Sequence, residues 1–272
     1  MNPTAPRSVT GRADGWIVGP PRRDPPSLRL FCLPYVAGAA SVYAPWRGAL
    51  GEHTEVCAIE LPGRQTRWRT PAYTRLGPLV DALASALRNE LDVPWALFGH
   101  SMGALIAFEL ARELRRRGAG EPRVLFVSAG PAPRLRGGSP RVHDLPAARI
   151  AARIAALGGL PEELRAEPEL LRLFLPVIRA DFAVCETYRY RPERPLDCPV
   201  VAFAGRDDAE VPPERMAPWA EETAGRFTRH VLPGGHFFLR TAQAELLRAV
   251  HGALGAPGAP GRPGRPGAPG AP

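Results

Sequence analysis

The sequence predicts an α/β fold with a mostly parallel central sheet flanked by helices. Short apolar runs alternate with longer helical stretches along most of the chain, and runs that are apolar on both faces are typical of parallel strands covered by helices. A serine bracketed by glycines directly follows one such run, as at a tight strand-to-helix turn. The expected strands are Leu28–Leu33, Val56–Leu61, Trp95–Phe98, Val124–Ser128, Val200–Ala204 and Phe227–Leu232.

The length of 272 residues fits one substantial domain, which we place at residues 27–253. Residues 1–26 are rich in Pro and Arg and are expected to be mostly disordered, with a possible short strand only at 16–18. Residues 254–272 contain six Gly-X-Pro triplets. So few triplets are too short for a collagen-like triple helix, and we expect a disordered tail.

One connection between the expected strands is unusually long. About seventy residues separate Ser128 from Val200, far more than a crossover needs, and such stretches are usually functional insertions. The segment at about 133–190 is expected to contain helices at 145–157 and 168–188. Their apolar residues either pack onto the main domain or form a lid with an apolar channel over the glycine-bracketed serine.

The charge does not indicate a nucleic-acid partner, although the formal net charge is +8. All 35 basic residues are arginine, as expected from a GC-rich genome, and several lie in the two terminal segments. The run Arg115–Arg117 falls at an expected helix C-terminus, where cations offset exposed carbonyl groups. We therefore expect no nucleic-acid binding.

The four cysteines form no C-x-x-C pair, which disfavours a zinc site or a disulfide framework and is typical of buried thiols in a reducing compartment. They are Cys32, Cys57, Cys185 and Cys198. No run of about eighteen apolar residues exists that could span a membrane. We expect a cytoplasmic, soluble monomer.

The glycine-bracketed serine is Ser101, in the pentapeptide Gly99-His100-Ser101-Met102-Gly103. It lies between the strand at 95–98 and an expected helix at 104–117. A serine at so sharp a turn is exposed at the carboxyl end of the sheet, and glycines two residues before and after it avoid mutual crowding. Ser101 is therefore the candidate nucleophile, while the backbone direction is expected to turn the His100 ring away from it.

A serine hydroxyl needs a base to accept its proton and a carboxylate to orient that base. His236, just after the last strand in a Pro-Gly-Gly-His segment, is the candidate base. Asp208 follows the preceding strand and is the candidate acid, with Asp207 as the alternative and Glu210 less favoured. The chain order Ser, Asp, His is that of α/β-hydrolases, so we predict this fold.

Acyl transfer also requires donors for the oxyanion that forms on the attacked carbonyl. One is expected to be the backbone N–H of Met102, the residue after the nucleophile. The other is expected from the loop at residues 34–40, whose small residues allow the backbone to approach a substrate.

Several motifs resemble the stand-alone (type II) thioesterases that accompany polyketide and nonribosomal peptide synthetases, over about Leu28 to Leu247. The matching segments are Leu30–Tyr35, Ser41–Trp46, Leu61–Arg64, Phe98–Gly103, Leu175–Phe182, Cys185–Tyr188, Pro195–Pro199 and Leu232–Leu239.

This resemblance implies hydrolysis of acyl thioesters on the phosphopantetheine arm of acyl or peptidyl carrier-protein domains, which frees carriers blocked by wrong units. It gives Ser101, Asp208 and His236 the triad positions, and the N–H groups of Met102 and Val36 the oxyanion-hole positions. The family usually has Ala-Gly-Gly in that loop, whereas this chain has Val36-Ala37-Gly38. No metal or bound cofactor is expected, since a thiolate leaving group and a preorganised hole suffice.

Two other interpretations remain open at this point. The same triad could act on a small ester or a free acyl-CoA, or transfer the acyl group to an alcohol. In a different class, the chain could be a carrier-binding protein without catalytic activity.

Overall fold

The computed structural model describes residues 12–19, 26–136, 141–156 and 168–255, and these residues form one seven-stranded sheet. The strand order is β1-β3-β2-β4-β5-β6-β7, with every neighbouring pair parallel except β1 and β3. The predicted mostly parallel sheet is therefore confirmed. The strands are β1 (Ile17–Val18), β2 (Leu28–Leu33), β3 (Thr54–Ile59), β4 (Trp95–His100), β5 (Leu125–Ser128), β6 (Val200–Gly205) and β7 (Phe227–Leu232).

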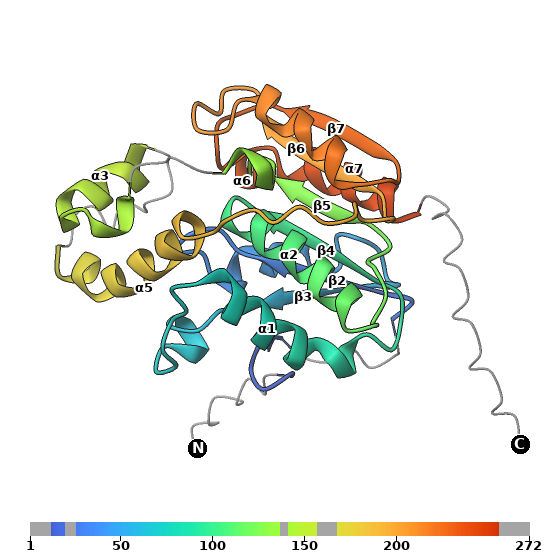
Figure 1. Ribbon diagram of the computed structural model, residues 1–272, viewed down its shortest axis with the longest axis horizontal. Coiled ribbons are helices and arrows are strands. Elements are labelled where there is room, and N and C mark those ends of the chain that lie inside the picture. Colours follow the sequence, from blue (N-terminus) through green and yellow to red (C-terminus); the bar gives the residue numbers. More distant parts are fainter. Residues whose placement is uncertain (1–11, 20–25, 137–140, 157–167, 256–272) are drawn as a thin grey trace, which may run out of the picture.

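Helices cover both faces of this sheet (Figure 1). Helices α1 (Leu76–Leu87) and α2 (Met102–Arg116) share one buried apolar cluster with Phe31 and Leu33 of β2. The 3-10 helix η1 (Ala40–Trp46) and α7 (Gln243–Gly255) share a second cluster with Leu30 and Cys32 of the same strand. Successive residues of a strand face opposite sides of the sheet, which is why the run is apolar throughout.

The remaining helices lie in the connections. They are α3 (Ala147–Ala156), α5 (Pro168–Glu186), α6 (Phe238–Thr241), η2 (Gln65–Arg67), η3 (Arg88–Glu90), η4 (Pro133–Leu135), η5 (Val142–Asp144) and η6 (Pro213–Glu222).

The observed β3 begins two residues before the predicted strand at 56–61. Its first residues, Thr54 and Glu55, pair with Leu28 and Arg29 of β2 although neither is apolar. Glu55 is buried beside Arg29, whose Nε donates a hydrogen bond to its carboxylate at 2.9 Å. The strand thus includes two polar residues, one of them in an ion pair, which the apolar pattern does not predict.

The folded unit extends beyond both expected boundaries. Trp16 and Ile17 are buried, and β1 pairs antiparallel with β3, so the folded part begins before residue 27. At the other end, α7 continues to Gly255. The other residues expected to be disordered, 1–11, 20–25 and 256–272, lie outside the described part of the chain.

The long insertion between β5 and β6 is helical, as predicted, and carries α3 and α5, which lie together at one side of the molecule (Figure 1). Ile150 and Ile154 of α3 form a small buried cluster with Ile178 of α5. The later part of α5 joins the main core through Val184. The insertion therefore has an apolar centre of its own and is anchored to the sheet through α5.

Candidate active site

Ser101 occupies the turn between β4 and α2, with φ of 56° and ψ of −108°. This positive φ is rare for a residue with a side chain and costs conformational energy. Hydrogen bonds to the surrounding structure hold the turn: the Ser101 N–H donates to the Ser128 carbonyl oxygen of β5 at 2.7 Å. The strained geometry presents the hydroxyl at the carboxyl end of the sheet, as the pentapeptide predicts.

The two flanking glycines are required by close backbone contacts. A Cβ atom on Gly99 would lie 2.0 Å from the carbonyl oxygen of Gly103, and a Cβ on Gly103 would lie 2.2 Å from the carbonyl oxygen of Leu33. Both distances are far inside van der Waals contact. Any side chain at either position would therefore push the turn away from β2 or open it.

The structure brings Ser101, His236 and Asp208 together from three separate loops. His236 Nε2 lies 3.1 Å from Ser101 Oγ, and His236 Nδ1 lies 2.8 Å from Asp208 Oδ2. A carboxylate only accepts hydrogen bonds, so Nδ1 carries the proton and Nε2 is free to accept one from the serine hydroxyl. This is the hydrogen-bond order that a serine nucleophile requires.

The two candidate acids differ sharply in their surroundings. Asp208 is only 3% exposed, and its second oxygen, Oδ1, accepts the N–H groups of Glu210 at 2.9 Å and Val211 at 3.0 Å. The side chain of Asp207 is exposed. Only Asp208 therefore contacts the imidazole and is itself held in position.

His100 is buried and points away from the serine hydroxyl, as expected. Its Nε2 donates to the backbone carbonyl oxygen of His236 at 2.9 Å, and its Nδ1 accepts the Ser128 hydroxyl at 2.9 Å. Burial lowers the pKa of His100 well below its usual range, so the ring is neutral. This residue links the serine turn to the loop that carries His236, a role that the sequence alone did not indicate.

The loop after β2 approaches the same site. Val36 and Met102 both line the cavity that contains Ser101 and His236. Met102 is the first residue of α2, so its N–H has no carbonyl partner within the helix. Ala37 adopts a φ of 61°, a value that favours glycine.

A buried ion pair holds this loop in its unusual conformation. Asp181 of α5 accepts the Ala37 N–H at 2.8 Å and is bound by both terminal nitrogens of Arg64, at 2.7 and 2.9 Å. Arg64 also donates to the Gly38 carbonyl oxygen at 2.9 Å. Both charged side chains are at most 5% exposed. Arg64 and Asp181 both lie in segments that carry the family resemblance, Leu61–Arg64 and Leu175–Phe182, but no local pattern predicts that they pair.

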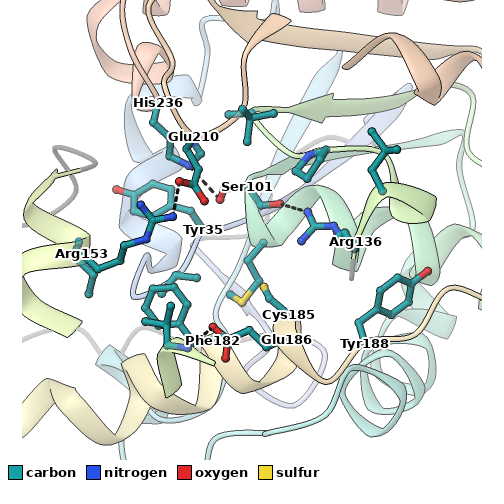
Figure 2. Close-up of a pocket in the computed structure, with 18 of the residues that line it drawn as sticks. Tyr35, Ser101, Arg136, Arg153, Phe182, Cys185, Glu186, Tyr188, Glu210 and His236 are labelled. Carbon is teal, nitrogen blue, oxygen red and sulfur yellow. Dashed lines mark hydrogen bonds and ion pairs between the residues drawn. The ribbon is translucent and has the colours of Figure 1, made fainter. Parts of the chain in front are cut away.

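The site opens into a cavity of about 630 Å³. Figure 2 shows side chains from the sheet loops and from the helical insertion around it, with Phe182 and Cys185 on the insertion side. Leu145 and Ile154 of the insertion also line the cavity. The insertion therefore forms part of the cavity wall.

The described residues contain no helix long and apolar enough to cross a membrane. Across the same part of the chain, no three His, Cys, Asp or Glu side chains are grouped as metal ligands would be. The four cysteines are free thiols.

The chain is similar to known thioesterases in sequence and in structure. The thioesterase domain family matches residues 28–254. Thioesterase PikA5 of Streptomyces venezuelae is 37% identical over 226 residues, covering 81% of this chain and 78% of the relative.

Two solved structures extend the likeness to the fold. RedJ, a thioesterase from the prodiginine pathway of Streptomyces coelicolor, is 41% identical with a TM-score of 0.81, covering 87% of this chain and 96% of RedJ. BorB, a type II thioesterase from the borrelidin biosynthetic cluster, is 38% identical with a TM-score of 0.82, covering 90% and 99%. With the sheet order and the serine turn described above, these similarities establish that the chain belongs to the thioesterase family of the α/β-hydrolase fold.

Proposed function

We propose that this thioesterase hydrolyses acyl groups from the phosphopantetheine arm of acyl or peptidyl carrier-protein domains, and so clears blocked carriers of a synthetase. The observation that carries the proposal is the continuous hydrogen-bonded path from Ser101 through His236 to Asp208 at one wall of the cavity. The relatives support the substrate class, because RedJ and BorB are described as thioesterases of biosynthetic pathways.

In the proposed reaction, His236 accepts the proton of Ser101 while the serine oxygen attacks the thioester carbonyl. The N–H groups of Met102 and Val36 stabilise the negative charge that develops on the carbonyl oxygen. His236 then returns the proton to the departing thiolate, which leaves an acyl group on Ser101. Water, activated by His236, repeats the sequence and releases the acid.

Asp208 stays ionised in this scheme and stabilises the imidazolium form of His236 through the 2.8 Å contact. The proposed reaction uses no metal ion or organic cofactor. The phosphopantetheine group belongs to the substrate, and its thiolate is a good leaving group.

Replacement of the nucleophile tests this function. We expect Ser101→Ala to lower kcat roughly 10⁴- to 10⁶-fold on acyl-carrier thioesters, because the members of a triad act as a unit. Ser85→Ala, at an exposed serine of α1, is the matched control and should retain wild-type rates. Hydrolysis of acyl-carrier thioesters by folded Ser101→Ala at near wild-type rates would rule out the proposed nucleophile.

The same assay separates the alternative substrates. Rates are compared on acyl-carrier protein, acyl-CoA and p-nitrophenyl esters, and we expect the highest kcat/KM on the carrier. A higher value on esters or free acyl-CoA would contradict the carrier substrate. Labelling of Ser101 by a fluorophosphonate is expected for an enzyme and is not expected for a carrier-binding protein without activity.

A further inference from the structure

The carboxyl ends of β4 and β5 carry a buried polar pair, His100 and Ser128. These residues are partners in the parallel register of the two strands, so their side chains lie on the same face of the sheet. Two residues earlier, the same register pairs Phe98 with Phe126, and both belong to a buried apolar cluster. This face is therefore apolar until its last position, where an imidazole and a hydroxyl are fully buried.

The hydrogen bonds of this pair end on the backbone of the catalytic base. The Ser128 hydroxyl donates to His100 Nδ1 at 2.9 Å, and His100 Nε2 donates to the His236 carbonyl oxygen at 2.9 Å. Buried polar groups cost free energy unless they are hydrogen-bonded, and apolar side chains would continue the packing of this face without that cost. Packing alone therefore does not explain the pair.

Both hydrogen bonds have a fixed direction. A backbone carbonyl only accepts, so His100 Nε2 carries a proton. Burial lowers the pKa of His100 well below its usual range, so the ring is neutral and Nδ1 keeps a lone pair. The Ser128 hydroxyl donates to that lone pair and thereby favours the tautomer that holds the backbone of His236.

Ser128 is also bound to the nucleophile, through a different atom. Its carbonyl oxygen accepts the Ser101 N–H at 2.7 Å. One buried residue at the end of β5 is thus connected to both groups that exchange a proton in the proposed reaction. Those groups, Ser101 Oγ and His236 Nε2, lie 3.1 Å apart.

Aromatic rings fix the position of the His100 imidazole between the two. Its ring centroid lies 5.5–6.0 Å from the centroids of four neighbouring rings, those of Tyr35, His236, Phe237 and Phe238. Three of these rings belong to the loop that carries the base. A change in the hydrogen bonds of His100 is therefore transmitted to that loop rather than absorbed by free rotation of the ring.

We propose that Ser128 is a positioning residue for catalysis: its hydroxyl, acting through His100, holds the imidazole of His236 at hydrogen-bond distance from the Ser101 hydroxyl. The proposal rests on the thioesterase function above and adds a residue that does not line the cavity. Loss of this hydroxyl should therefore change kcat more than KM. A misplacement of about 1 Å between reacting groups can cost roughly a hundredfold in rate.

The test measures two reactions of Ser128→Ala. One is steady-state hydrolysis of an acyl-pantetheine thioester, and the other is labelling of Ser101 by a fluorophosphonate, which needs no carrier. The variant keeps the backbone contact with the Ser101 N–H. We expect kcat and the labelling rate constant to fall about ten- to a hundredfold, with KM within about threefold of wild type. Ser128→Thr restores the hydroxyl and should return both rates to within about threefold of wild type.

Thr223→Val is the matched control for the loss of a buried hydroxyl. Thr223 Oγ1 donates to the Cys198 carbonyl oxygen at 2.6 Å. Cys198 precedes β6, so this hydrogen bond lies at the edge of the sheet opposite to the active site. The control should lower the melting temperature, as Ser128→Ala does, but leave kcat and labelling unchanged.

A double-mutant cycle tests the route through His100. His100→Phe keeps a ring without its hydrogen bonds and should lower kcat at least as much as Ser128→Ala. The double variant should be no slower than His100→Phe alone, because the two residues act in series. His100→Gln, whose amide nitrogen can donate to the His236 carbonyl oxygen, should be faster than His100→Phe.

Wild-type kcat and labelling in Ser128→Ala would overturn the proposal, as would losses that add in the double variant or that folded Ser128→Thr does not restore. If Ser128→Thr does not fold, His100→Gln takes its place, and a rate equal to that of His100→Phe would overturn the proposal. A wild type that the fluorophosphonate does not label would contradict the proposed function itself. Normal labelling of wild type and of Ser128→Ala alike removes only the role of Ser128.

Discussion

Asp207 and Asp208 are neighbours in the chain, yet only Asp208 is buried against His236 and held by two backbone N–H groups. Sequence alone left both open, since either could follow β6 into the site. The backbone conformation of the loop after β6 decides which of the two side chains faces the imidazole. Two adjacent aspartates do not determine that conformation by residue type. The contact with His236 is what distinguishes the two acids.

This difference leads to a paired mutational prediction. Asp208→Asn keeps the shape but removes the charge that orients the imidazole, and we expect kcat to fall about 10⁴-fold. Asp207→Asn should remain within about threefold of wild type, because its side chain is exposed. Steady-state hydrolysis of an acyl-pantetheine thioester measures both variants. The reverse order of effects would transfer the role to Asp207.

Because of Glu60, just after β3, we expect the free energy of unfolding to have an unusual pH dependence. This side chain is fully buried, and neither carboxylate oxygen accepts a hydrogen bond from the described residues. Burial raises its pKa to about 7, although nearby Arg64 acts in the opposite direction. Between about pH 4.5 and 7 the unfolded chain releases this proton while the folded chain retains it. Stability from this group therefore falls as pH rises through that window.

Glu60→Gln should remove this effect. We expect its free energy of unfolding to exceed that of wild type by about 2–3 kcal/mol at pH 8 and to match it near pH 4. Urea unfolding at a series of pH values gives the comparison. Parallel curves for the two proteins across this range would show that Glu60 ionises normally in the folded state.

At the scale of elements, the Arg64–Asp181 pair connects the helical insertion to the loop that carries Val36. We expect Asp181→Asn to lower kcat at least tenfold with a smaller change in KM, because the loop loses its anchor and the proposed oxyanion donor, the Val36 N–H, is displaced. Breaking a buried pair also leaves Arg64 unpaired, so the melting temperature should fall. Kinetics and thermal unfolding of the same preparation measure both effects.

Glu169→Gln provides the control on the same helix. Glu169 pairs with Arg172, and both side chains are largely exposed, so its loss should change neither kcat nor stability measurably. A lowered melting temperature for Asp181→Asn with an unchanged kcat would mean that the pair only stabilises the fold. Weaker inhibition by a tetrahedral phosphonate, at similar substrate affinity, would support a role in positioning the loop.

The elements themselves were largely predictable. Each predicted strand from residue 28 onward is present, because parallel strands covered on both faces are apolar throughout and stand out from amphipathic helices. The start of β3 was missed because Thr54 and Glu55 are polar. Arg64 and Asp181 are 117 positions apart in the chain. No local sequence pattern predicts their contact, because it forms only when the insertion packs against the loops of the sheet.

At the scale of the whole molecule, the formal net charge of +8 bears on how a carrier protein approaches. If acidic carrier domains are the substrate, long-range attraction speeds their encounter, and salt screens it. We expect kcat/KM on an acyl-carrier protein to fall severalfold between 50 and 500 mM NaCl, roughly as screening predicts.

The same acyl group on N-acetylcysteamine is the matched control and should show little salt dependence, because this small thioester carries no net charge. A flat response with the carrier would count against electrostatic steering. An equal fall with both substrates would assign the salt effect to the enzyme's own structure.

The hydrogen bond from His100 to the backbone of His236 has a consequence for motion within the enzyme. It links the turn that carries Ser101 to the loop that carries His236, and both follow strands of the sheet rather than belonging to the insertion. A displacement of the insertion would then leave the contact between Ser101 and His236 in place. The Ser101–His236 contact is thus set by loops of the sheet, whereas the loop that carries Val36 depends on the insertion through Asp181.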